Sequence, residues 1–166
     1  MQYQTLWTPS HERVADSAMY HFMQHVNARF GKSFLSYDEL WQWSVDQPAD
    51  FWETFWQYGH LKYSQGFSQV VDDPKKMPGA RWFSGARLNF AENLLQRRDD
   101  HPAIIFRRED GSTRTITFNQ LYSETNRIAD GLKKLGVVKG DRIASFMPNI
   151  PETVIAMLAT ASIGAI

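Results

Sequence analysis

The sequence contains no cysteine. This absence excludes disulfides, thiolate metal sites and a cysteine nucleophile, and it is typical of proteins from a reducing compartment. The chain also lacks an excess of charge of either sign, because 18 lysines and arginines are balanced by 18 aspartates and glutamates. Without a sustained basic run, a nucleic-acid partner is not expected.

Long hydrophobic runs are missing as well. No apolar stretch approaches the roughly 20 residues that a membrane span needs. Residues 1–20 have no basic region followed by an apolar run, so a signal peptide is not expected. The sequence also has no Asn-x-Ser/Thr glycosylation acceptor. Together these absences predict a cytoplasmic globular protein that neither crosses nor binds a membrane.

The common motifs of nucleotide binding and hydrolysis are absent. The sequence has no Gly-x-Gly-x-x-Gly, no Gly-x-Ser-x-Gly and no phosphate-binding loop that ends in Lys-Ser/Thr. Gly131 and Gly136 have the spacing of such a loop, but Val137 and Val138 follow them. This segment is therefore interpreted as a helix surface with a glycine at its C-terminal end.

Two histidines are candidate metal ligands. His21 and His25 are four residues apart and could share an ion on one helix face. A third ligand would be required, and Glu12 and Asp16 lie a turn or more away along the same helix. A solvated helix face is the favoured interpretation. We predict no catalytic, cofactor-binding or metal-binding residue in this chain.

Aromatic residues are abundant, at 14% of the chain, and five of the six tryptophans lie between Trp41 and Trp82. The spacing of apolar residues predicts one helix over residues 8–29, which Gly31 ends. Two further helices are predicted, from the Ser36/Glu39 capping pair through Trp43 and from Pro48 up to Gly59. The aromatic stripe at 51–56 is interpreted as core, or as a surface against another domain of the same protein. A partner-binding surface is the alternative.

The second half of the chain alternates between strand and helix patterns. "AIIFRR" and "TRTITF", joined by "EDGS", predict a hairpin. A helix follows from the Thr117/Gln120 capping pair to Gly136, then a buried strand at "RIASFM", then a helix from about 149 to 164. This order predicts an α/β fold with a parallel or mixed sheet. Because the sequence stops on "VIAMLATASIGAI", we expect a truncated domain with uncovered apolar surface.

The stretch "WFSGARLNFAEN", residues 82–93, is dense enough in functional residue types to suggest an active site. We predict a structural role instead. Asn89 and Glu92 have the spacing of a capping pair, and Arg81 and Arg87 are expected to pair with acidic residues. Four side chains are expected to seat the N-terminal module on the α/β domain: Trp82, Phe83, Leu88 and Phe90.

Four blocks resemble, in order, the start of the AMP-forming acyl-CoA synthetases: "WSVDQPADFW", "WFSGARLNFAENLL", "ITFNQLYSETNRIADGLKKLGVVKGDRIASFMPN" and "PETVIAMLATASIGAI". Within that family, "LWTPSHERV", "FAENLL" and "LATASIGAI" look like the acetoacetyl-CoA synthetases. The acetyl- and propionyl-CoA synthetases are the alternative. The resemblance extends from residue 6 to residue 166.

The resemblance implies a domain order and a reaction. Residues 1–98 would form an aromatic-rich helical N-terminal module, with its signature at about 36–95, and residues 99–166 the incomplete start of the adenylate-forming α/β domain. The boundary is expected at 98–102. Intact members of the family are ligases of lipid and ketone-body metabolism. In their reaction, ATP and the acid give an acyl-adenylate and pyrophosphate. CoA then displaces AMP, and magnesium assists.

The sequence does not match the family's phosphate loop, hinge or catalytic lysine segment. We therefore expect this chain to be inactive alone and to hold no cofactor. Its expected partner is the remainder of its own enzyme, which is a large domain and a mobile C-terminal domain. Self-association through uncovered surface is also expected. The alternative function is a stand-alone interaction module that binds or regulates a partner enzyme.

Overall fold

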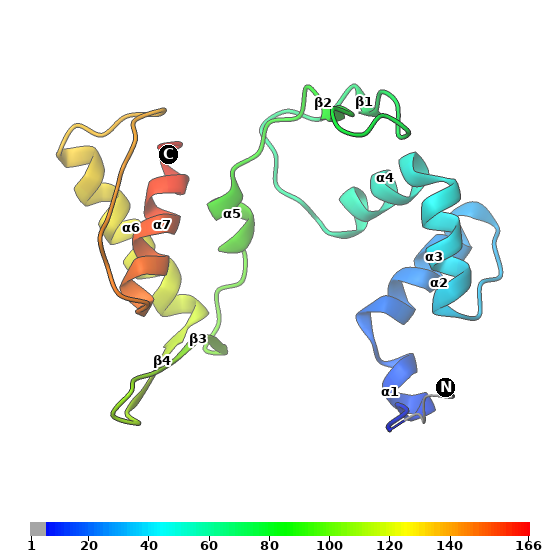
Figure 1. The fold of residues 1–166 in the computed structure, drawn as a ribbon, viewed down its shortest axis with the longest axis horizontal. Helices are drawn as coiled ribbons and strands as arrows, with labels where there is room; N and C mark the ends of the chain where they lie inside the picture. The colour runs from blue at the N-terminus through cyan, green and yellow to red at the C-terminus, as the bar shows by residue number, and fades with distance from the viewer. Residues whose placement is uncertain (1–5) are drawn as a thin grey trace. The chain divides into compact units, whose positions relative to one another are not determined.

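The computed structural model describes residues 6–166; residues 1–5, the start of the predicted N-terminal module, lie outside the described part. The chain forms two compact units. The first comprises residues up to Leu61 together with Phe67–Gly85, and the second comprises Lys62–Gly66 with Ala86–Ile166. The helix and strand order is shown in Figure 1.

The first unit begins with two helices, α1 (His11–Ala15) and α2 (Ala18–Phe30). The prediction of one continuous helix over 8–29 is wrong, because Ser17 interrupts it. Its hydroxyl donates to the Val14 carbonyl at 2.7 Å and accepts the Tyr20 N–H at 3.2 Å, so it caps a new helix. Gly31 ends α2 at a φ of 61°, as predicted.

Helices α3 (Tyr37–Asp46) and α4 (Pro48–Tyr58) follow. The predicted capping pair before α3 is confirmed, since Ser36 Oγ accepts the Glu39 N–H at 3.3 Å and Glu39 Oε2 accepts the Ser36 N–H at 2.9 Å. Hydrogen bonds from the Leu35 and Ser36 N–H groups lower the pKa of Glu39. Pro48 lies in the first turn of α4, as the sequence predicts.

Aromatic side chains build the core of the first unit. Phe22 makes edge-on ring contacts with Phe51 and Phe55 at 5.7 and 5.8 Å, and Phe51 stacks on Phe55 at 6.4 Å. The buried residues of this cluster are Phe22, Met23, Val26, Leu40 and Trp43. The aromatic stripe of α4 is therefore core in part, although Trp52 and Phe55 stay 41% and 46% exposed.

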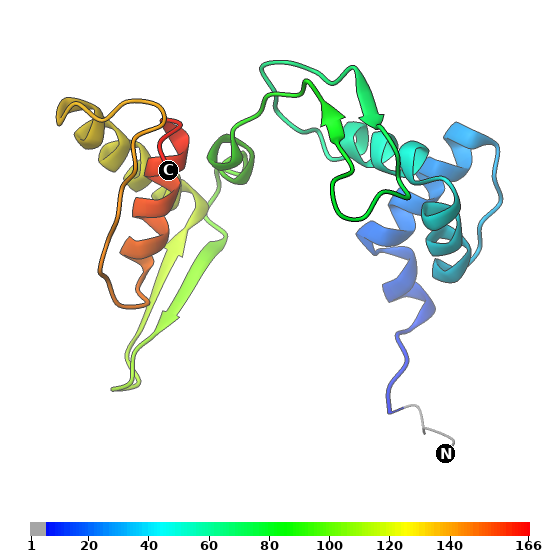
Figure 2. The ribbon, with the colours of Figure 1, turned by 45° about the horizontal axis from the view of Figure 1, so that its top comes forward.

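A small sheet completes the first unit, with β1 (Gln69–Val71) antiparallel to β2 (Trp82–Ser84) (Figure 2). The sequence did not predict these strands, because three residues are too few for an alternating pattern to be recognised. The ring of Trp56, which is buried, contacts Phe67 and Phe83 at 5.3 and 4.8 Å. These contacts attach the sheet to α4.

The second unit contains α5 (Phe90–Leu94), the hairpin β3 (Pro102–Arg107) and β4 (Thr113–Thr117), α6 (Phe118–Lys134) and α7 (Pro151–Ser162). The predicted hairpin is confirmed, and its turn includes Gly111 at a φ of 83°. Together with the first unit, this gives the mixture of helices and small sheets that the predicted α/β class implies. In residues 6–166, no helix is both long and apolar enough to span a bilayer.

Both ends of α6 are as predicted. At its start, Thr117 and Gln120 form a reciprocal capping box. At its end, the N–H of Gly136 donates to Lys133 and the N–H of Val137 donates to Leu132, at 3.0 and 3.1 Å. This is the Schellman pattern, and it requires the positive φ of 88° that Gly136 adopts.

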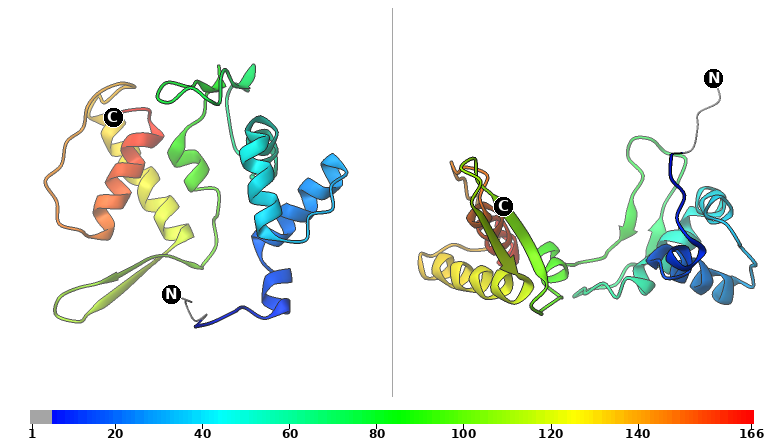
Figure 3. Two further views of the ribbon diagram at one scale, coloured as in Figure 1. Left: turned by 45° about the vertical axis from the view of Figure 1, so that its right-hand side comes forward. Right: turned by 90° about the horizontal axis from the view of Figure 1, so that it is seen from below.

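The core of the second unit lies where α5 and α6 pack against α7 (Figure 3). Ile155, Leu158 and Ala159 of α7 are buried there against neighbours on α5 and α6. The expectation that α7 leaves its apolar surface uncovered is therefore wrong for this face of the helix, which α5 and α6 cover. Met157, on α7, stays 53% exposed.

The predicted buried strand at "RIASFM" is also wrong. Residues 142–147 are irregular, and Phe146 is fully exposed. At one end of the segment, the Ile166 N–H donates to Asp141 and the Ile143 N–H donates to Ile166, both at 2.7 Å. This alternation has the form of a parallel ladder. Among the described residues, this pairing is the part of the predicted parallel sheet that forms. The assigned strand pairs, β1–β2 and β3–β4, are antiparallel.

The two compact units divide between Gly85 and Ala86. Helix α5 groups with the second unit because it packs against α7. The domain boundary expected at 98–102 remains a prediction about the longer enzyme.

Candidate functional site

The stretch 82–93 belongs to both units. Its first three residues form β2, where Trp82 contacts Trp52 at 6.3 Å within the first unit. Its second half, from Ala86 onward, belongs to the second unit. The expected role of these side chains in seating one module on the other stays a prediction.

Asn89 connects the start of α5 to the end of α7. Its Oδ1 accepts the Glu92 N–H at 3.1 Å, which confirms the predicted cap. Its Nδ2 donates to the carbonyls of Ala161 and Ser162 at 2.8 and 3.3 Å. Those carbonyls belong to the last turn of α7, and that of Ala161 also accepts the Gly164 N–H at 3.0 Å. One side-chain amide therefore caps the start of α5 and binds the end of α7.

Asn93 has a comparable structural role. Its Oδ1 accepts the Lys62 N–H, and its Nδ2 donates to the Lys62 carbonyl, both at 2.8 Å. The backbone of Arg87 pairs with Gln65 nearby, with an N–H to carbonyl distance of 2.9 Å. These contacts hold the 62–66 segment against α5. Both asparagines of the stretch thus hold the second unit together.

The expectation that Arg81 and Arg87 pair with acidic residues is wrong for their side chains. No ion pair within the described part of the chain involves either residue. The backbone N–H of Arg81 donates a hydrogen bond to the Asp72 carboxylate at 2.8 Å. This bond is also the main cause that lowers the pKa of Asp72. The Arg87 side chain lines a cleft instead.

This cleft, of about 1100 Å³, is the candidate functional site and lies wholly within the second unit. Its charged lining residues are Arg87, Arg98, Lys139 and Glu92. The Arg98 guanidinium lies over the Tyr122 ring, 3.8 Å from its centroid. The sequence did not indicate the cleft, because its walls come from segments far apart in the chain.

The cleft is charged but shows no sign of acid–base chemistry. The carboxylates with a lowered pKa lie outside it: Glu39, Asp72, Asp99, Asp110 and Glu152. In each of them the largest cause is a hydrogen bond donated to the carboxylate, at a helix start, a turn or an ion pair. The arrangement suits the binding of an anion better than proton transfer.

The histidines considered as metal ligands are both exposed on α2. The His25 ring packs against Tyr58 with centroids 5.1 Å apart, and the His21 ring lies edge-on to Tyr20 at 6.3 Å. Over residues 6–166, no group of three or more histidine and acidic side chains is placed to hold a metal ion.

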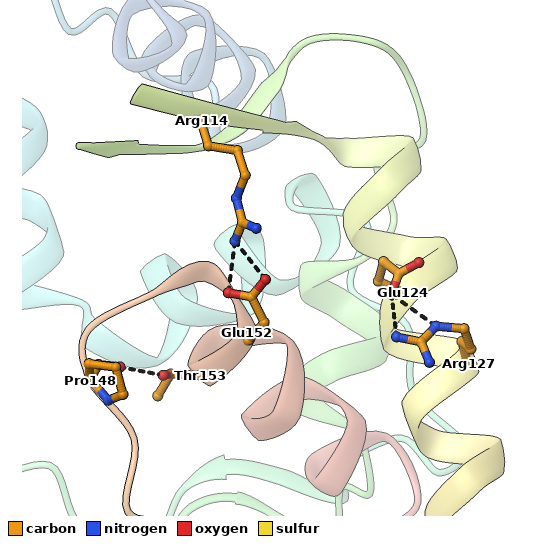
Figure 4. Close-up of polar contacts among 6 residues, drawn as sticks. All are labelled: Arg114, Glu124, Arg127, Pro148, Glu152 and Thr153. Carbon is orange, nitrogen blue, oxygen red and sulfur yellow. Dashed lines mark hydrogen bonds and ion pairs between the residues drawn. The ribbon is translucent and has the colours of Figure 1, made fainter. Parts of the chain in front are cut away.

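A second charged cluster, shown in Figure 4, joins the hairpin to α7. Arg114 of β4 reaches toward the first turn of α7, and its Nη2 lies 2.7 Å from both carboxylate oxygens of Glu152. Thr153 donates to the Pro148 carbonyl at 2.7 Å beside it. Both partners of the ion pair are 48% exposed. The cluster is therefore interpreted as structural.

Replacing Arg114 with glutamine should lower the free energy of unfolding by less than about 1 kcal/mol, because exposed pairs are weak. The pKa of Glu152 is lowered, chiefly by the hydrogen bond from Arg114. Stability from this carboxylate is thus present above its ordinary pKa and is lost as pH falls through the lowered one. Urea unfolding at neutral and acid pH measures this, with Arg107→Gln as the control. An unchanged pH dependence in Arg114→Gln would contradict the expectation.

Two family models match the chain. The model described as acetyl-coenzyme A synthetase N-terminus matches residues 37–94, and the model described as AMP-binding enzyme matches residues 90–166. The two matches meet within α5, the helix that Asn89 caps.

Known proteins match nearly the whole chain. The acetoacetyl-coenzyme A synthetase of Rhizobium meliloti (strain 1021) is 42% identical over 97% of this chain, and the malonamoyl-CoA synthetase of Penicillium aethiopicum is 37% identical over 97%. The solved acetoacetyl-CoA synthetase from Streptomyces lividans matches 99% of the chain with a TM-score of 0.86 and 34% identity.

The chain covers 25% of the Rhizobium relative, 23% of the Penicillium relative and 26% of the Streptomyces structure, so it spans about a quarter of the length of these relatives. The match to an N-terminal family model places the similarity in the first part of such proteins. The chain belongs, as an N-terminal portion, to the acetoacetyl-CoA synthetase homologues among the AMP-binding enzymes.

Proposed function

We propose that this chain is the N-terminal portion of an enzyme that joins acetoacetate to CoA. In that enzyme, ATP and acetoacetate give an acyl-adenylate and pyrophosphate, and the CoA thiol then releases AMP. The observation that supports this most strongly is the continuous similarity to acetoacetyl-CoA synthetases through both compact units of the chain.

Within such an enzyme, we propose that this portion supplies structure and that the chemistry is encoded elsewhere. Adenylation brings the phosphates of ATP close to a carboxylate, which requires cationic groups and bound magnesium at the reacting atoms. No segment of the sequence matches the family's phosphate loop or catalytic lysine segment. The dense stretch 82–93 uses its two asparagines to hold backbone groups.

The choice of acid is proposed to depend on residues outside this chain. The Penicillium relative is named for malonamoyl-CoA, yet it is about as similar to this chain as the relatives named for acetoacetyl-CoA. The N-terminal portion therefore does not separate the two substrates. For the same reason, acetoacetate is assigned from the majority of the relatives' names and not from a pocket.

The coding sequence downstream of Ile166 tests the proposal. A continuing reading frame that encodes a Gly-rich phosphate loop ending in lysine would support the N-terminal portion of a synthetase. A stop codon directly after Ile166, in an intact gene expressed at this length, would contradict it. That outcome would favour the stand-alone module that binds or regulates a partner enzyme.

We further propose that the enzyme is cytoplasmic and that the main partner of this portion is the remainder of its own chain. The exposed surface of the second unit suits such a partner. Its largest exposed apolar side chains include Ile105 at 73%, Leu135 at 83% and Phe146, which is fully exposed. Phe146 lies in the irregular 142–147 segment, in which Ile143 pairs with Ile166 and the residues after it belong to no assigned strand.

Studied alone, the chain should self-associate at high concentration through this segment, because exposed apolar side chains and unpaired backbone favour edge-to-edge contacts. Light scattering should report a mass that rises with protein concentration. Phe146→Ser should reduce the effect, while Met157→Ser, at a half-exposed position on α7, serves as the control. A monomer at every concentration would contradict the expectation.

A further inference from the structure

One row of side chains on α3 is apolar and exposed. Tyr37, Trp41 and Val45 are spaced four residues apart, so they follow one another along a single face of the helix. Their exposed fractions are 59%, 52% and 54%. A different face of α3 carries Leu40 and Trp43, which are buried in the core of the first unit. The core contacts of α3 therefore do not use this row, which stays available to a partner.

A groove of about 440 Å³ continues this row toward α1 and α2. Tyr37 belongs to both the row and the groove, and Leu35 lines the groove with an exposed fraction of 87%. From the two helices, Val14 and Met19 line it and are 43% and 50% exposed. Among the described residues that line the groove, none is a lysine, arginine, aspartate or glutamate. Row and groove together form the α3 surface, and an apolar surface of this form is typical of sites that receive an amphipathic helix.

The charge beside the α3 surface has a single sign. Asp38 and Asp46 lie in the row next to the apolar one, and neither forms an ion pair among the described residues. Other carboxylates of the chain also lack an ion pair, so the feature that sets α3 apart is the absence of cations. Between Lys32 and Lys62 the sequence has no lysine or arginine, whereas it has five carboxylates: Asp38, Glu39, Asp46, Asp50 and Glu53. A partner with basic side chains around an apolar face would therefore complement this surface.

The walls of the groove indicate the source of the partner. The family model described as acetyl-coenzyme A synthetase N-terminus matches residues 37–94, so the walls that α1 and α2 supply lie before it. An acetoacetyl-CoA synthetase of Macaca fascicularis matches 100% of this chain, which includes both helices. A contact with the adenylating domain that the wider family shares would not require walls that the family model lacks. The groove therefore suits a separate protein better than the remainder of the enzyme.

We propose that the α3 surface binds an amphipathic helix of a separate protein, in which lysine or arginine side chains flank the apolar residues that become buried. The apolar side chains of that helix would fill the groove and cover Trp41, and its cations would meet Asp38 and Asp46. The two aspartates are about 12 Å apart along α3, a distance that slightly more than two turns of the partner helix would span. The proposal goes beyond the assignment to an acetoacetate-activating enzyme and does not depend on that reaction.

A second copy of this chain fits the α3 surface less well. Two α3 helices packed face to face would bring the carboxylates of one copy against those of the other, and like charges across an interface are destabilising. A basic helix avoids this repulsion and still covers Trp41. Tryptophan is enriched among the residues that carry most of the binding energy of an interface, and Trp41 is the middle residue of the apolar row. Trp41 is therefore the expected anchor of the contact.

Fluorescence anisotropy with a labelled synthetic helix tests the proposal. The probe is an amphipathic peptide of about 18 residues, long enough to form a helix, with leucine on one face and lysine beside it. Saturable binding to one site is expected, and its affinity should fall with added salt. Trp41→Ser should weaken binding roughly tenfold, as for an aromatic anchor. Met157→Ser, at a half-exposed position on α7, should leave binding unchanged.

Three results of this titration would overturn the proposal. They are an absence of saturation, an unchanged affinity in Trp41→Ser, and equal binding of a scrambled peptide of the same composition. The scrambled peptide has the same charge but no apolar face, so equal binding would show attraction to charge alone.

Asp46→Lys provides the decisive comparison. A lysine is compatible with the last turn of a helix, where Asp46 lies. The variant should bind the lysine peptide roughly fivefold more weakly and a matched glutamate peptide more tightly by a similar factor. Damage to the fold would weaken both and could not produce this reversal. Glu109→Lys, in the exposed hairpin turn of the second unit, is the control and should change neither. An unchanged preference in Asp46→Lys would overturn the proposal.

Two further measurements distinguish the other occupants. If the full-length enzyme fails to bind the lysine peptide that this chain binds, the proposal is overturned in favour of the remainder of the enzyme. Self-association of this chain that Trp41→Ser abolishes would overturn it in favour of a second copy. Equal binding by the chain and the full-length enzyme, with self-association unaffected by Trp41→Ser, would support a separate protein.

Discussion

Replacing Leu158 with alanine should lower the free energy of unfolding of the second unit by about 2–5 kcal/mol, as for other large-to-small substitutions in cores. Leu158 has no exposed surface and lies in the cluster formed by Leu95, Leu121 and Ile155. Its neighbours are fixed on three packed helices, so the space is not easily refilled. This one substitution tests whether α7 is covered, as the structure has it, or exposed.

The two units can be followed separately in this experiment. All six tryptophans lie in the first unit, so tryptophan fluorescence reports on that unit, while far-UV circular dichroism also reports on α6 and α7. In Leu158→Ala, the dichroism transition should move to lower urea than the fluorescence transition. Met157→Ala is the control, because its side chain is 53% exposed and should cost much less. A similar loss in both variants would contradict a buried α7.

Three substitutions at Asn89 separate its two structural roles. Asn89→Ser keeps an oxygen that can cap α5 but loses the donors to Ala161 and Ser162. Asn89→Ala loses both roles and should cost about 1–3 kcal/mol in total, for a lost cap together with the lost hydrogen bonds to the end of α7. The carbonyl of Ala161 keeps the N–H of Gly164 in this variant. Asn89→Asp keeps the cap but turns an anion toward two carbonyl oxygens, so it should cost at least as much as Asn89→Ala.

The order of stabilities among these variants is the informative result. Urea unfolding should rank Asn89→Ser above Asn89→Ala, and Asn89→Asp at or below Asn89→Ala. Asn119→Ala, which removes an exposed asparagine with a long contact to Asp100 at 3.3 Å, is the control. Asn89→Asp as stable as the parent would show that the contact with α7 contributes nothing. In an intact enzyme, a large loss of turnover at unchanged stability would identify Asn89 as part of the active site.

Local features of the fold could be predicted from the sequence. The caps at Ser36 and Thr117, the glycine ends at Gly31 and Gly136 and the hairpin turn depend on neighbouring residues and were all correct. The break at Ser17 was missed because the apolar spacing on its two sides continues without interruption. Capping by a serine within such a pattern has no strong signal of its own.

Features that join distant segments could not be predicted in the same way. The bond from Asn89 to Ala161 spans 72 residues, and the cleft combines the 62–66 segment with α5, α6 and the end of α7. The exposed state of 142–147 depends on which strands lie beside it, which the apolar run itself does not specify. For the same reason, the sequence indicated Asn89 as a cap but not as a contact between helices.

We propose that this portion supplies structure while the catalytic groups lie elsewhere in the enzyme. The most direct test is to measure ATP–pyrophosphate exchange by this chain alone with acetoacetate. The preparation must be free of host synthetase, and a full-length acetoacetyl-CoA synthetase serves as the positive control. We expect no exchange above the blank, because no segment of the sequence matches the family's phosphate loop or catalytic lysine segment. Exchange that follows the concentration of this chain would contradict the account. Its disappearance in Asn89→Ala at unchanged stability would in addition place chemistry in residues 82–93.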